Sequence, residues 1–169
     1  MGFVKRIFVI VLSVFLVAVL LTVFSQPKWK LRRSTAEFTD MVTGDIPDDL
    51  HLTIYYVDPM LLFRAPLGIE ELKRIADTQI DVGAEELAEH IAVLRKLDPS
   101  ALQTVQERPY IDARLVYVFE AGDDKLLEVT VCEINRNAYV NDIEVKHDPV
   151  LYELIIPFLS EEDREILGF

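Results

Sequence analysis

The chain has 169 residues, with 29 acidic and 17 basic side chains, and its formal net charge is −12. All 29 acidic residues lie in residues 35–169, which hold 11 of the basic ones and therefore carry a charge of −18. A surface this negative repels the phosphate backbone, so the composition excludes a nucleic-acid-binding function. The single cysteine, Cys132, excludes an internal disulfide.

Residues 1–34 combine basic flanks with a long apolar run. The run from Ile7 to Phe24 has 18 residues, of which only Ser13 and Thr22 are polar. As a helix it would be ~27 Å long, close to the thickness of the hydrocarbon core of a bilayer. The pattern predicts a single membrane-spanning anchor that contacts lipid along residues 7–24. Basic residues flank it on both sides: Lys5, Arg6, Lys28, Lys30, Arg32 and Arg33.

Two other interpretations of this leader stay open, a cleaved signal peptide and a buried core helix. The apolar run is longer than that of a typical signal peptide, and Val23-Phe24-Ser25 makes a poor cleavage site. The charges on the two flanks are nearly balanced, but the short tail ending in Lys5-Arg6 favours an amino terminus in the cytoplasm. We expect a single-pass protein of the cell membrane with its carboxyl-terminal domain outside the cytoplasm.

The remainder divides into an acidic tether over residues 35–49 and one globular domain over residues 50–169. Alternating apolar residues from Leu50 to Val57 predict a strand. A helix is expected from Pro66 onward, and a second helix is expected after Asp81, which would serve as its N-cap.

The second half of the domain carries hairpin signals. Residues 110–120 and 125–134 are expected to pair around a turn, with Glu120 facing Lys125 and Val116 facing Val129. A shorter hairpin has Asn141-Asp142 at its tip, where both residue types tolerate positive φ. Helices are expected over residues 149–159 and 160–167, the second with Ser160 and Asp163 as an approximate capping box. This order of elements predicts the α+β class, an antiparallel sheet with helices packed on one face.

No catalytic or metal-binding pattern emerges. His51, His90 and His147 are far apart and fit no metal-ligand spacing, and the paired carboxylates fall at helix starts and turns, where they are solvated. Nucleophile motifs and glycine-rich phosphate loops are absent from the sequence. We expect no cofactor, no metal and no catalytic residue, and we expect Cys132 to be a small buried side chain.

Tyrosines give the best indication of a binding surface. Tyr55 and Tyr139 are expected to be exposed on edge strands, where tyrosine supplies rigid contact area for a protein or peptide partner. Each tyrosine has a second interpretation, a ring that caps the core with its hydroxyl in water.

The layout resembles small membrane-anchored or secreted domains of unknown function from Gram-positive bacteria. The resemblance rests on the leader, on HLTIYYVDP followed by PLGIEELKRIA, and on YVNDIEVKHDPVLYELIIPFL. It implies one α+β domain behind a basic and apolar leader, and it supplies no catalytic residues.

Three functional hypotheses follow from the sequence. The first is a non-enzymatic, membrane-anchored module that binds a protein or peptide at the cell surface. The alternative is a hydrolase or modifying enzyme of the cell envelope that uses carboxylate and histidine side chains. The third is a structural subunit whose apolar helix is itself the interface, and it ranks last because Ser13 and Ala18 are five residues apart rather than four.

Overall fold

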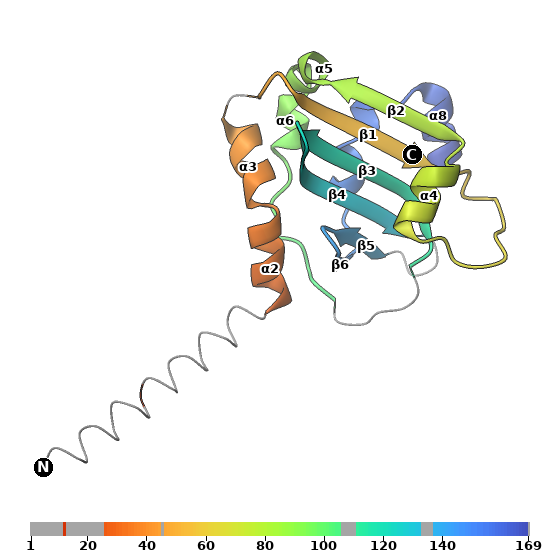
Figure 1. Ribbon diagram of the computed structural model, residues 1–169, viewed down its shortest axis with the longest axis horizontal. Helices are drawn as coiled ribbons and strands as arrows, with labels where there is room; N and C mark the ends of the chain where they lie inside the picture. The colour runs from red at the N-terminus through yellow and green to blue at the C-terminus, as the bar shows by residue number, and fades with distance from the viewer. Residues whose placement is uncertain (1–11, 13–25, 45, 106–110, 133–136, 169) are drawn as a thin grey trace, which may run out of the picture.

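A six-stranded antiparallel sheet forms the centre of the domain (Figure 1). The computed structural model describes residue 12 and residues 26–44, 46–105, 111–132 and 137–168. The strand order is β2-β1-β3-β4-β5-β6. The strands are β1 Leu50–Tyr56, β2 Thr78–Gly83, β3 Ala113–Ala121, β4 Asp124–Cys132, β5 Asn137–Val140 and β6 Ile143–Lys146. The predicted α+β class with an antiparallel sheet is confirmed.

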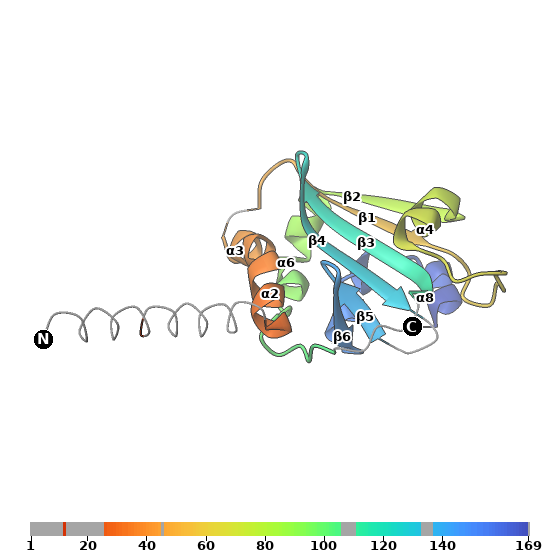
Figure 2. The same cartoon turned by 60° about the horizontal axis from the view of Figure 1, so that its bottom comes forward.

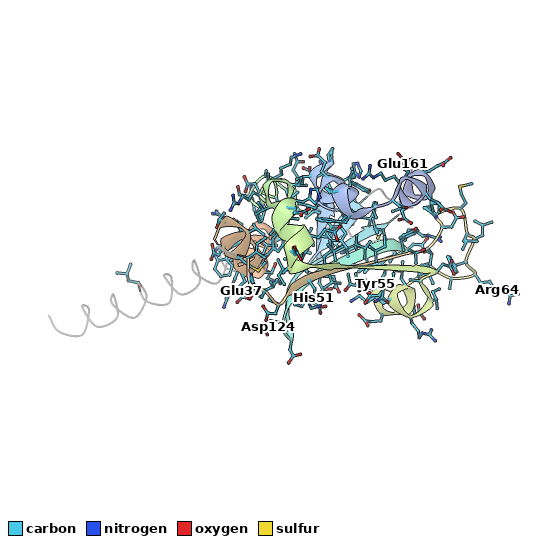
Figure 3. The ribbon with its side chains drawn as sticks, turned by 90° about the horizontal axis from the view of Figure 1, so that it is seen from above. Glu37, His51, Tyr55, Arg64, Asp124 and Glu161 are labelled. Atoms are coloured by element: carbon cyan, nitrogen blue, oxygen red, sulfur yellow. The ribbon has the colours of Figure 1, made fainter. Side chains whose placement is uncertain are left out.

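Short helices cover both faces of this sheet. They are α2 Pro27–Ser34, α3 Ala36–Thr43, α4 Ile69–Ile75, α5 Ala84–Glu89, α6 Ile91–Leu94, α7 Val150–Glu153, the 3-10 helix η1 Ile156–Phe158 and α8 Glu161–Leu167. Most of them contribute side chains to the larger core, whereas α4 packs on the opposite face (Figure 3). The expectation that all helices share one face is therefore wrong. The reason is that Leu72 of α4 covers apolar residues on the other side of β3.

Successive side chains of the central strands point to opposite faces of the sheet, and apolar residues on the two faces form two separate cores. Leu52, Ile54 and Phe119 point into the larger core, and Val116 and Val118 point into the smaller one. A strand that is apolar on both sides must be covered on both faces, as β3 is here. The smaller core is closed by α4 and by the segment that leads to it.

The predicted β3–β4 hairpin forms, but its register changes along its length. Glu120 faces Lys125, as expected, and an irregularity follows at the next pair. Beyond it Val116 faces Thr130, whereas Val129 faces Tyr117. The expected Val116–Val129 pair is wrong because one extra residue in β4 shifts the register, which is what a β-bulge does.

The predicted tether over residues 35–49 is wrong for most of its first half. Residues 36–43 form α3, and its Phe38 and Val42 are buried in the larger core together with Leu31 of α2. These residues recur at helical spacing, so one face of the two helices is apolar despite the many charges between them. The domain core thus begins at α2.

Asp81 is not the N-cap that the sequence indicated, because it lies within β2. Ile80 and Val82 alternate with polar residues there, and β2 pairs with β1. The helical segment that follows is interrupted at His90, which ends α5 and precedes α6. At the other end of the chain, the predicted capping box of Ser160 and Asp163 is confirmed.

Figures 1 and 2 place α2 and α3 at one end of the sheet and the loop between β1 and α4 at the opposite end. No helix within the described residues has both the length and the apolar character needed to cross a bilayer. The expected anchor, from Ile7 to Phe24, lies outside those residues except for Leu12.

Candidate functional site

The two tyrosines that the sequence indicated lie in one row across the sheet. Tyr55 faces Val116, which faces Thr130, which faces Tyr139. Directly paired residues project to the same side of a sheet, so all four share the face that carries the smaller core. The two tyrosines are three strands apart, or about 14 Å.

Neither tyrosine lies on an edge strand, so that part of the prediction is wrong. β1 lies between β2 and β3, and β5 lies between β4 and β6. Tyr55 is half-buried against the smaller core. Tyr139 is only 6% exposed and lines a cavity between α2 and the β5–β6 hairpin. The reason is that β2 covers the outer side of β1 and β6 covers the outer side of β5, and this strand order depends on pairing between distant segments. A partner-binding role for the two tyrosines stays a prediction.

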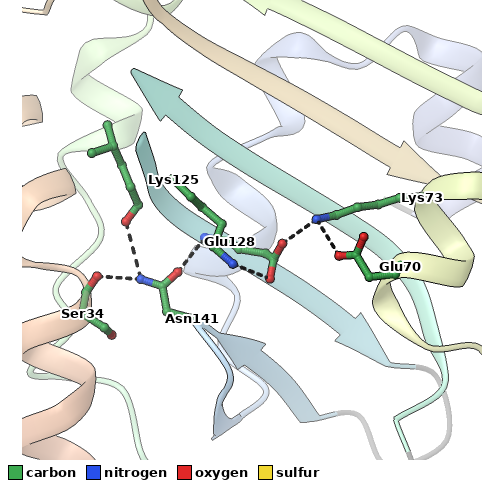
Figure 4. A network of polar contacts seen from close by, with 7 residues as sticks. Ser34, Glu70, Lys73, Lys125, Glu128 and Asn141 are labelled. Atoms are coloured by element: carbon green, nitrogen blue, oxygen red, sulfur yellow. Dashed lines mark hydrogen bonds and ion pairs between the residues drawn. The ribbon is translucent and has the colours of Figure 1, made fainter. Parts of the chain in front are cut away.

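The buried carboxylate of Glu128 lies on the same face of the sheet and is the centre of a network of polar contacts (Figure 4). Glu128 is 4% exposed and accepts hydrogen bonds from Lys73 at 2.6 Å and Lys125 at 3.2 Å. Burial alone would raise the pKa of Glu128, but the hydrogen bond and charge of Lys73, with those of Lys125, outweigh burial and lower it. This ion pair fixes α4 to β4 and is structural, because both charges are compensated.

The same network connects the sheet to α2. Asn141, at the tip of the β5–β6 hairpin, accepts a hydrogen bond from the Glu128 backbone N–H at 2.7 Å. Its side-chain amide donates to the carbonyl oxygen of Ser34 at 2.6 Å. Asn141 and Asp142 both have positive φ, as the predicted tight turn requires. Helix α2 is therefore held against the hairpin by a specific contact.

The basic residues that follow the apolar run lie on α2, and two of them, Lys30 and Arg33, line a surface groove. The groove has a volume of about 490 Å³, and Trp29, Lys30, Arg33, Ser34 and Glu37 line it. The Arg33 guanidinium lies 5.5 Å from the centre of the Trp29 ring. Lys28 and Arg32 are exposed on the same helix. Tryptophan beside basic residues is typical of side chains at a membrane–water interface.

The opposite end of the domain exposes apolar side chains instead. In the loop between β1 and α4, Leu62 is 97% exposed and Met60 is 84% exposed. The loop backbone is held from inside, because the buried Arg114 donates to the carbonyl oxygen of Leu61 at 2.8 Å. The Arg114 guanidinium also lies 4.9 Å from the centre of the Phe63 ring, which packs on the smaller core.

Side-chain hydrogen bonds also hold the backbone of this loop near its first residues and where it leads into α4. The Asp58 side chain accepts a hydrogen bond from the Met60 backbone N–H at 2.7 Å. The buried Asp112 pairs with Arg114 at 3.0 Å and accepts from the Leu67 backbone N–H. The exposed apolar side chains therefore project from a backbone that is held in place.

The histidines do not assemble into one site. His51 pairs with Glu120 at 3.2 Å on the surface, and His90 makes an edge contact with Phe158. His147 lies against Tyr152 and shares a cavity of about 380 Å³ with Glu153. The Glu153 carboxylate accepts a hydrogen bond from Lys96 at 2.7 Å.

The described part of the chain has no group of three or more His, Cys, Asp or Glu side chains that would hold a metal ion. Cys132 is buried, as predicted, and burial raises the pKa of its thiol to about 11. A thiol with this pKa is protonated at neutral pH and is a poor nucleophile.

Comparison with protein-family models, with curated proteins and with solved structures found no match to this chain. The site must therefore be interpreted from its own residues. No local sequence pattern indicated that Arg114 and Glu144 are buried, at 7% and 5% exposed. Each lies in a β-strand pattern where a charged residue at alternate positions is ordinarily solvated.

Proposed function

We propose that this chain is a single-pass membrane protein whose domain stands outside the cytoplasm and binds a protein or peptide partner without catalysis. The apolar run and its basic flanks support the anchor. The observation that carries the binding function is the loop between β1 and α4, with Met60 and Leu62 held in solvent.

The loop supports binding because exposed apolar side chains on an ordered backbone are ready to dock. Burying Leu62 in a partner removes apolar surface from water, and little ordering cost remains since Arg114 already fixes the backbone. Tyr55 lies on the same sheet face as the smaller core beneath this loop and extends the contact surface. The partner would present an apolar groove at the end of the domain remote from α2.

The test of binding is cross-linking of the full-length protein in its native membrane, with a photoreactive residue at position 62. We expect one stoichiometric partner, which is lost in Leu62→Ser and weakened in Tyr55→Ala. Ile166→Ser is the matched control, because Ile166 is an exposed apolar residue of α8, outside the loop. A partner retained equally in Leu62→Ser would exclude the loop as the binding surface.

The test of the anchor is separate. We expect the full-length protein to stay in the membrane pellet after alkaline carbonate extraction. Protease added outside intact cells should cleave the domain. Release by carbonate would overturn the anchor, and protection from external protease would overturn the orientation.

A second function, a cell-envelope hydrolase or modifying enzyme, is supported by the cavity that His147 shares with Glu153. A histidine beside a carboxylate is a feasible acid–base pair. Against it, the Glu153 carboxylate is already paired with Lys96. Hydrolysis of envelope substrates that is lost in His147→Asn and kept in His51→Asn would favour the enzyme.

A further inference from the structure

A cavity of about 430 Å³ lies between α2 and the β5–β6 hairpin, and a buried carboxylate lines it. Glu144 is only 5% exposed. Its Oε1 accepts a hydrogen bond from the Asn137 side chain at 2.8 Å, but its Oε2 has no hydrogen-bond partner in the described part of the chain. Buried polar atoms without partners are rare in folded proteins, so this oxygen is available to a hydrogen-bond donor that enters the cavity.

The charges around this cavity indicate the kind of donor. Asp142 contributes a second carboxylate from the hairpin tip, and Lys30 of α2 contributes one ammonium group. A primary ammonium ligand has three N–H donors and a positive charge, so it satisfies Glu144 with a charge-assisted hydrogen bond. The Lys30 side chain in the same cavity suits an anionic group on the same ligand.

The position of the cavity along the chain indicates where such a ligand comes from. Pro27 lines the cavity and lies three residues after Phe24, the last residue of the apolar run. Three residues reach at most ~11 Å, and the headgroup layer on each side of a bilayer is about 5–8 Å thick. If residues 7–24 span the membrane, the cavity is within reach of the lipid headgroups.

We propose that this cavity binds the headgroup of an aminophospholipid, with its ammonium group on Glu144 and Asp142 and its phosphate on Lys30. The proposal rests on the membrane anchor of the proposed function. The groove that Lys30 shares with Trp29 and Arg33 continues the basic surface for the phosphate. The domain would thereby recognise a zwitterionic headgroup by its N–H donors.

The first experiment measures which lipids stay bound to the full-length protein. The protein is reconstituted in nanodiscs of phosphatidylcholine with added phosphatidylethanolamine or added phosphatidylglycerol, and retained lipids are counted by native mass spectrometry. Phosphatidylcholine has no N–H donor, and phosphatidylglycerol has no ammonium group. We expect preferential retention of phosphatidylethanolamine, reduced about tenfold or more in Glu144→Gln, which corresponds to the loss of one charge-assisted hydrogen bond.

Matched variants separate binding from folding. Glu89→Gln changes an exposed carboxylate of α5, away from the cavity, and should retain the lipid as the wild type does. Asp142→Asn keeps a residue that tolerates positive φ and should weaken retention with unchanged thermal unfolding. Lys30→Met should reduce retention of both added lipids.

A soluble probe makes failure of the site distinguishable from failure of the anchor. O-phosphoethanolamine, titrated into the full-length protein in detergent, should raise the midpoint of thermal unfolding in the wild type and not in Glu144→Gln. This readout does not require that residues 7–24 span a membrane, whereas carbonate extraction tests that point alone.

Three results would overturn the headgroup site. Equal retention of phosphatidylglycerol and phosphatidylethanolamine, unchanged in Glu144→Gln, would mean that Lys30 binds the phosphate of either lipid without recognition of the ammonium group. Stabilisation by a lysine-containing peptide but not by O-phosphoethanolamine would assign the cavity to a peptide partner. A nuclear magnetic resonance spectrum in which the Lys30 ammonium contacts Glu144, with no response to either probe, would mean that the chain closes its own cavity.

Discussion

The two ends of the domain distribute apolar and charged side chains in opposite ways. At the α2 end, Leu31 is buried and the basic side chains are exposed, as in an ordinary amphipathic helix. At the loop end, Arg114 is buried, whereas Met60 and Leu62 are in solvent. The first arrangement keeps its apolar side chains buried, and the second leaves apolar surface in contact with water.

This difference makes the loop end the one suited to an apolar external contact. An exposed leucine costs little by itself, because much of any protein surface is apolar. A buried arginine is different, since a charge in the interior must be paired to be tolerated. Arg114 is paired with Asp112 and bonds the loop backbone, so the fold uses a buried ion pair to hold apolar side chains outward.

The largest effect is expected from removing the buried charge of the loop end. Arg114→Leu leaves the buried Asp112 carboxylate without its guanidinium and releases the Leu61 carbonyl oxygen. We expect the free energy of unfolding to fall by about 3–5 kcal/mol. Urea unfolding measures the loss, and faster proteolysis after Arg64 would show that the loop has been released.

Lys96→Met is the matched control for this variant. Lys96 pairs with Glu153 at 2.7 Å, but both side chains are about half exposed, at 53% and 44%. Exposed pairs contribute about 1 kcal/mol or less. If Arg114→Leu lowers the free energy of unfolding by no more than Lys96→Met does, the buried arginine does not stabilise the loop. The proposed contrast between the two ends of the domain is then wrong.

A smaller effect is expected at the centre of the sheet face, between the two ends. Lys73→Met removes the shorter of the two ion pairs of Glu128, and the Lys125 contact at 3.2 Å remains. We expect a loss of about 1–3 kcal/mol at neutral pH. Urea unfolding again provides the measurement.

The effect of Lys73→Met should depend on pH in a defined direction. The Glu128 pKa is lowered from its ordinary value of 4.5, so the stabilisation is complete above that pH and is lost as the pH falls through the folded-state pKa. Although burial opposes it, the Glu128 contact raises the Lys73 pKa above its ordinary 10.5, so stability is lost only as the pH rises through that raised value. If the free energy of unfolding of Lys73→Met differs from that of wild type by the same amount throughout the acid range, the ion pair between Lys73 and Glu128 is contradicted.

The sequence predicted the parts of the fold that depend on local chemistry. The β3–β4 hairpin follows from apolar alternation around a polar turn, and the second hairpin follows from Asn141-Asp142, whose positive φ values were anticipated. The Ser160 cap is likewise a property of four consecutive residues. In each case neighbours in sequence determine the structure.

Features that depend on distant residues were not predictable in this way. Strand order placed Tyr139 inside the sheet, and the wall of its cavity comes from α2, more than 100 residues earlier. The register shift in β4 removed the expected Val116–Val129 pair although both strands were identified. Glu144 is buried because the same distant segments come together around it. No local sequence pattern could therefore indicate the candidate headgroup site.

The α2 end has its own test, with a smaller effect. Asn141→Gly keeps a residue that accepts positive φ and removes three side-chain contacts, to the Glu128 N–H and to the carbonyl oxygens of Ser34 and Leu126. We expect a loss of about 1–2 kcal/mol, with faster amide hydrogen exchange in α2. Asp142→Gly alters the neighbouring turn position without touching those contacts, so unchanged exchange in that variant serves as the control.

The smallest effect on stability is expected at the exposed tip of the loop. Leu62→Ser changes a side chain that is 97% exposed, so the free energy of unfolding should stay within about 0.5 kcal/mol of wild type. Partner capture should nevertheless be lost, because the Leu62 side chain is expected to contribute to binding and not to folding. A clear loss of stability in Leu62→Ser would mean that this leucine packs on the domain itself. The exposed apolar surface would then have no need of a partner, and the loop end would be an ordinary part of the fold.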